Sequence, residues 1–114
     1  MKPTNLSVVK ISPVSLGITT ISTLEIDLNH INYGYDKETK SYKKKTRSAF
    51  NEIEVAHIFS LLNDCFLEPV GKQDNYLYFA EEIEYMKKSY LIAFCIDRND
   101  PRTAGIITLY KIKN

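Results

Sequence analysis

The residue types best suited to proton transfer and phosphate binding lie at three separate places in the sequence: His30, the pair Lys45 and Arg47, and the pair Thr108 and Tyr110. An imidazole with an ordinary pKa of about 6.5 exchanges a proton near neutrality. Lys45 and Arg47 are two residues apart, so in an extended segment both point the same way and can hold one phosphate. Thr108 and Tyr110 share a strand face for the same reason. The alternative is ordinary structure, because Thr and Tyr also favour strands and a histidine can lie at a strand end in water.

A lysine-rich segment surrounds the basic pair. From residue 36 to residue 47 there are six basic and two acidic residues, a local charge of +4 in a chain of net charge +1, which leaves −3 for the remainder. Lysines bind phosphates, and tyrosine rings stack on unpaired bases. A solvated loop without a ligand is the competing interpretation. The predicted substrate-binding residues are Tyr33, Tyr42, Lys43 and Lys44.

The histidines and cysteines show no metal-site spacing. Cys65 and Cys95 form no CxxC motif, and we interpret both as small buried residues. His57 is expected on the solvent side of a helix. The sequence therefore predicts no metal and no cofactor.

The chain is expected to fold as one α+β domain. It has 114 residues, 44% of them hydrophobic, with no secretory signal and no apolar run as long as a membrane span, so no membrane partner is expected. Helix and strand patterns predict one main helix followed by a three-strand antiparallel meander. The predicted segments are an N-terminal arm or short helix over 1–22, a strand over 23–31, a basic loop over 32–48, the main helix over 49–64, and the meander over 75–113. Within 1–22, residues 6–11 suit a short strand or an apolar arm, and residues 15–22 suit a short helix or a turn.

Two elements have the clearest patterns. Ser48 is the predicted N-cap of the main helix, whose apolar stripe comprises Val55, Ile58, Phe59, Leu62 and Phe66. In the strand over residues 89–97 the side chains on both faces are mostly apolar. This pattern predicts a central strand that is covered on both faces.

Short motifs resemble those of a known toxin family. Their order along the chain is similar to that in the barnase, EndoU, colicin E5/D and RelE-like (BECR) ribonuclease toxins. The motifs are His30-Ile31, Lys45-Thr46-Arg47-Ser48-Ala49-Phe50, Glu54-Val55 before Ile58, Tyr-Leu-Tyr-Phe over 76–79, the strand over 90–97 and the strand over 106–110. These toxins share a helix followed by a curved antiparallel sheet, which the resemblance implies here as well. Toxin domains at the C-termini of contact-dependent inhibition proteins are the most similar. The resemblance covers about residues 24 to 113.

This resemblance implies a metal-independent ribonuclease toxin that cleaves RNA, often tRNA. His30 would take the proton of a ribose 2′-hydroxyl, Lys45 and Arg47 would hold the phosphoryl oxygens, and Thr108 would position the phosphate. The opposite acid would be His57 or Tyr110. The resemblance further implies a cognate immunity protein or antitoxin, a cytoplasmic site of action, and delivery into a target cell as part of a larger toxin.

A second class of function stays open. The same surface and lysine-rich segment suit a non-enzymatic binding protein, such as an immunity protein, an antitoxin or an RNA-binding adaptor. Convergence of His30, Lys45, Arg47 and Thr108 around one site favours the enzyme, whereas a His30 remote from Thr108 favours binding alone. A third alternative is packing of a partner on an exposed edge over residues 76–84.

Overall fold

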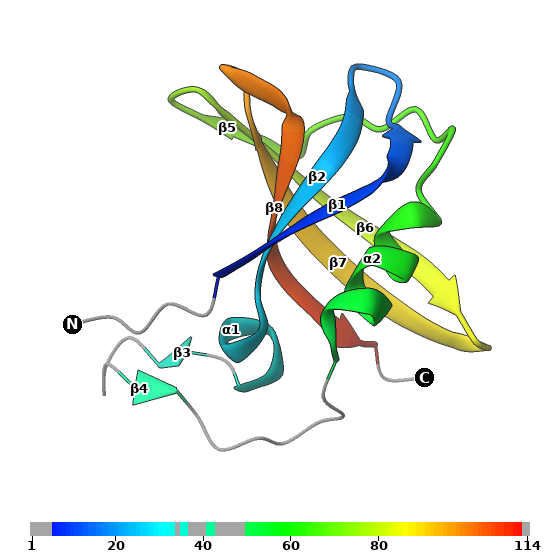
Figure 1. Cartoon of the computed structure of the whole chain (residues 1–114), viewed down its shortest axis with the longest axis vertical. Helices are drawn as coiled ribbons and strands as arrows, with labels where there is room; N and C mark the ends of the chain where they lie inside the picture. Colours follow the sequence, from blue (N-terminus) through cyan, green and yellow to red (C-terminus); the bar gives the residue numbers. More distant parts are fainter. Residues whose placement is uncertain (1–5, 34, 37–40, 43–49, 113–114) are drawn as a thin grey trace.

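The computed structural model describes residues 6–33, 35–36, 41–42 and 50–112, and it confirms the α+β class (Figure 1). Its helices and strands, in chain order, are β1 (Leu6–Ser15), β2 (Thr20–Asp27), α1 (Leu28–Tyr33), β3 (Tyr35–Asp36), β4 (Ser41–Tyr42), α2 (Glu52–Ser60), β5 (Gly71–Gln73), β6 (Tyr76–Tyr85), β7 (Lys88–Asp97) and β8 (Asp100–Lys111).

The main sheet has six strands in the order β1-β2-β8-β7-β6-β5. The consecutive strands β6, β7 and β8 are antiparallel neighbours, as are β1 and β2. β2 and β8, however, run parallel, with Leu24 opposite Ala104 and Ile26 opposite Ile106. The predicted all-antiparallel sheet is therefore wrong, and the sheet is mixed. A parallel neighbour needs a long crossover connection, and the chain from α1 to β7 supplies it.

The N-terminal third agrees with the expectation in part. Residues 6–15 form the edge strand β1, which confirms the strand alternative at residues 6–11. A turn rather than a short helix follows at residues 16–19, and β2 begins at Thr20 and ends at Asp27. The last part of the predicted strand is the helix α1, because the Asp27 carboxylate accepts a hydrogen bond of 3.1 Å from the backbone N–H of His30. Buried Ile31 and half-buried Leu28 then point into the core. His30 consequently lies on a helix.

α2 begins later than its sequence pattern predicts. Its N-cap is Asn51, not Ser48, and the side chains of Asn51 and Glu54 form a reciprocal capping box with each other's backbone. The helix ends at Ser60, followed by turns and by Asp64 at φ 66°. The helical spacing therefore does not extend to Phe66, which is 87% exposed. The predicted inclusion of Phe66 in the apolar stripe is wrong.

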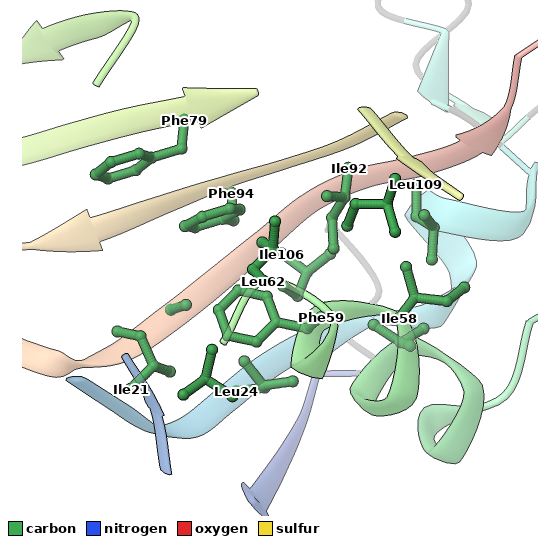
Figure 2. Packing of buried hydrophobic residues seen from close by; sticks show 14 of the residues in the cluster. Ile21, Leu24, Ile58, Phe59, Leu62, Phe79, Ile92, Phe94, Ile106 and Leu109 are labelled. Atoms are coloured by element: carbon green, nitrogen blue, oxygen red, sulfur yellow. The ribbon is translucent and has the colours of Figure 1, made fainter. Parts of the chain in front are cut away.

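One face of the sheet carries the core. Figure 2 shows Phe59 and Ile58 of α2 directed at the side chains of the sheet; the Phe59 ring meets the Phe94 ring edge-on at 5.1 Å, and Phe94 stacks on Phe79 at 5.0 Å. Each such aromatic contact adds about 0.5–1.5 kcal/mol beyond area burial. The predicted stripe residues Val55, Ile58, Phe59 and Leu62 are all buried.

The opposite face, called the open face below, is less enclosed. On β7, Ile92, Phe94 and Ile96 are buried on the core face, whereas Leu91, Ala93 and Cys95 on the open face are only half-buried. β7 is central, as predicted, but the described residues bury only one of its faces. Both cysteines are half-buried rather than fully buried. None of the helices that the structure describes has the length and hydropathy needed to cross a membrane.

Candidate functional site

The helix that carries His30 lies beside the strand that carries Thr108 and Tyr110. β2 pairs with β8 as far as Ile26 opposite Ile106, and α1 follows directly and contacts β8. Figure 1 shows α1 below the end of β2, next to the C-terminal half of β8. The parallel β2–β8 pair therefore brings together two predicted site elements that are far apart in sequence. We call this region the α1–β8 end.

Thr108 and Tyr110 share the open face. A bulge at Ile107 separates the pairs Phe94–Ile106 and Ala93–Thr108, after which Leu91 lies opposite Tyr110. The predicted shared face of Thr108 and Tyr110 is confirmed by this register, and both side chains are half-buried. His30 is also half-buried.

The four predicted basic residues, Lys43, Lys44, Lys45 and Arg47, lie outside the described residues. Tyr33 and Tyr42 are described only as backbone, in α1 and β4. The flanks of the basic segment are informative: β4 contacts α1, and the Phe50 ring packs edge-on against Tyr90 at 5.8 Å. Because Tyr90 lies opposite Lys111 on β8, both flanks of residues 43–49 lie at the α1–β8 end.

His57 lies elsewhere. It is exposed on α2, as predicted, and lines a shallow pocket with Ile11 and Ser12 of β1. β1 is separated from β8 by β2 in the sheet. The structure therefore does not bring His57 to the strand of Thr108, and of the two predicted opposite acids only Tyr110 lies on β8.

A pocket that the sequence analysis missed lies on the open face, toward the β7–β8 turn. It has a volume of about 220 Å³ and is lined by Glu25, Tyr76, Cys95, Asp97, Asp100, Thr103 and Gly105. Burial raises the pKa of the Cys95 thiol, and the charges of Glu25 and Asp97 raise it further against an opposing hydrogen bond from the Gly105 backbone. The signal in the sequence was the acidic residues at alternate strand positions, but only the β2–β8 pairing places Glu25 beside Cys95.

The chemistry available at the two places differs. The α1–β8 end offers an imidazole and hydroxyls, whereas the open-face pocket offers carboxylates. Among the described residues, no three histidine, cysteine, aspartate or glutamate side chains are grouped closely enough to hold a metal ion. Comparison with protein-family models, with curated proteins and with solved structures finds no match to this chain.

Proposed function

We propose that this protein is a metal-independent endoribonuclease toxin that cleaves RNA, with tRNA as the substrate that the family resemblance implies. The observation that supports it is the juxtaposition at the α1–β8 end. The helix of His30 contacts the strand of Thr108 and Tyr110, and both flanks of the lysine-rich segment reach the same end. Phosphate-binding cations and proton-transfer groups are both needed near one scissile bond.

In the proposed reaction His30 removes the proton from a ribose 2′-hydroxyl. The 2′-oxygen attacks the adjacent phosphorus, the bond from phosphorus to the 5′-oxygen breaks, and the products are a 2′,3′-cyclic phosphate and a 5′-hydroxyl. Tyr110 gives a proton to the departing 5′-oxygen and regains it from solvent. Lys45 and Arg47 hold the phosphoryl oxygens as negative charge develops, and Thr108 orients the phosphate.

The proposal extends to the biological setting. An RNA-cleaving toxin acts where RNA is, in the cytoplasm, and a cell that makes it needs a neutralising immunity protein or antitoxin. Delivery into a target cell as part of a larger toxin is consistent with the proposal. The lysine-rich segment is the natural contact for such an inhibitor, which would carry acidic groups in place of RNA phosphates.

The test is cleavage of total tRNA by the purified full chain in the presence of EDTA. We expect cyclic-phosphate ends on the products. His30→Ala should slow cleavage by about 10²–10⁴-fold, the usual contribution of one general acid or base. His57→Ala is the matched control and should cleave at the parent rate, since His57 lies on the β1 side of α2.

Urea unfolding of each variant separates lost chemistry from lost stability, because His30 is half-buried. Parent-like cleavage by His30→Ala would remove this residue from the mechanism. If the parent binds tRNA without cleaving it, the RNA-binding adaptor replaces the enzyme.

A further inference from the structure

The open face of the sheet has a strong excess of negative charge. Six described carboxylates lie on this face, together with Lys10, whose ammonium donates to the Thr23 hydroxyl at 3.5 Å. The six carboxylates are Glu25, Asp27, Glu82, Glu84, Asp97 and Asp100. Carboxylates in this number attract cations to the part of the face where they lie.

The middle of this face is hollow because its side chains are small. Gly105 lies between Glu25 of β2 and Cys95 of β7; a Cβ atom at Gly105 would approach the Cys95 sulfur to 3.4 Å and fill part of the hollow. The rings of Tyr76 and Tyr78, 6.5 Å apart, stand on the neighbouring strand β6. The pocket of about 220 Å³ at this point is large enough for one long side chain.

The carboxylates of the pocket are not neutralised by described cations. Glu25 and Asp100 form no ion pair with any lysine or arginine that the structure describes, and the Asp97 carboxylate accepts only the Asn99 backbone N–H, at 2.9 Å. Burial first, and then the charges of Glu25 and Asp97, raise the pKa of the Cys95 thiol beside them. Carboxylates next to tyrosine rings form a favourable site for a guanidinium or ammonium group.

We infer that the part of the open face around this pocket is a docking surface for a lysine- or arginine-rich segment of a partner protein, with one cationic side chain entering the pocket between Glu25, Asp100 and Tyr76. Charge complementarity identifies the occupant. Thr108 and Tyr110 lie on the same face, but the pocket lies toward the β7–β8 turn, at the other end of β8. The inference therefore does not depend on RNA cleavage.

The test measures binding of fluorescein-labelled deca-lysine to the full chain by fluorescence anisotropy at physiological salt, without RNA. Glu25→Gln combined with Asp100→Asn should raise Kd about three- to tenfold, the loss expected for two partly exposed ion pairs. The matched control is Asp64→Asn combined with Glu68→Gln, which removes the same charge from exposed residues outside the open face and should leave Kd nearly unchanged.

A second readout locates the contact. On a Cys65→Ser background, deca-lysine should slow alkylation of Cys95 in the parent and much less in the Glu25/Asp100 double variant. Equal weakening by both double variants, or no binding by the parent, would overturn the inference. The inference would also be overturned if spermine bound as tightly as deca-lysine, because the occupant would then be a small cation. It would be overturned as well if sedimentation showed that the chain self-associates and buries Cys95, because the occupant would then be a second copy.

Discussion

Gly17 and Gly105 are glycines for different structural reasons. Gly17 has φ +90°, and a Cβ there would lie 3.2 Å from the Phe66 Cα. Gly105 has no such backbone restriction, and its nearest neighbour would be the Cys95 sulfur at 3.4 Å. The first position requires glycine for backbone reasons, whereas the second mainly leaves space in the open-face pocket.

Gly17→Ala should therefore lower the free energy of unfolding by about 1–3 kcal/mol, the cost of a strained backbone position. Gly105→Ala should change it by less than about 0.5 kcal/mol, since lost unfolded-state entropy offsets the close sulfur contact. Urea unfolding measures both values. Equal losses in the two variants would contradict the assignment of strain to Gly17 alone.

The residue type of His30 indicated proton transfer, but the sequence around it predicted the wrong secondary structure. The alternation of apolar residues before it predicted a strand, yet the Asp27 carboxylate caps a helix instead. A short polar side chain that binds a backbone N–H three residues on competes directly with strand formation. The candidate base thus lies on α1, next to β8.

At the scale of elements, α2 depends on its first turn. Asn51 accepts from the Glu54 backbone N–H at 2.8 Å, and the Glu54 carboxylate accepts from the Asn51 N–H at 3.2 Å. The helix has only nine residues, and short helices gain little from propagation. The capping box therefore fixes where the helix that carries Phe59 begins.

Asn51→Ala should lower the free energy of unfolding by about 1 kcal/mol, the usual loss for an N-cap. Asn51→Ser, which keeps an accepting oxygen, should recover most of it. Ser48→Ala serves as the control, because Ser48 is the cap that the sequence pattern suggested, and should have no measurable effect. Thermal or urea unfolding decides between the two caps; a loss at Ser48 and none at Asn51 would contradict the structure.

At the scale of the whole molecule, charge is separated along the chain. The described residues include 13 Asp and Glu against 7 Lys and Arg, a net −6, in a chain of net +1; the remaining residues therefore carry +7. A net charge near zero hides this division. The proposed RNA contact uses the positively charged segment, and the proposed contact with a cationic segment uses the negatively charged part of the sheet.

This charge separation predicts that RNA affinity will depend on salt differently in variants of the lysine-rich segment and in variants of the acidic pocket. For single-stranded RNA, log K should fall with log salt by about 0.7 per phosphate contact, so Lys43→Gln combined with Lys44→Gln should flatten the slope by about 1.4. Glu25→Gln combined with Asp100→Asn should leave the slope unchanged. Anisotropy titrations across a salt series measure both slopes, and an equal change in both variants would argue against two separate surfaces.

The sequence predicted the elements whose patterns are local. The stripe Val55, Ile58, Phe59 and Leu62, the central position of β7, and the shared face of Thr108 and Tyr110 follow from local sequence patterns, and these agree with the structure. The error at Phe66 has a local cause, since periodicity does not show where a helix ends.

What only the tertiary structure decided is which elements are neighbours. The parallel pairing of β2 with β8 joins residues about eighty positions apart; no local pattern encodes such a pairing, because its stability comes from burial shared between distant segments. That single pairing places α1 beside β8, the strand that carries Thr108 and Tyr110, and it brings Glu25 and Cys95 into one pocket. The sequence by itself determined the residues available for chemistry and the α+β class, and the β2–β8 pairing determined which of those residues lie together.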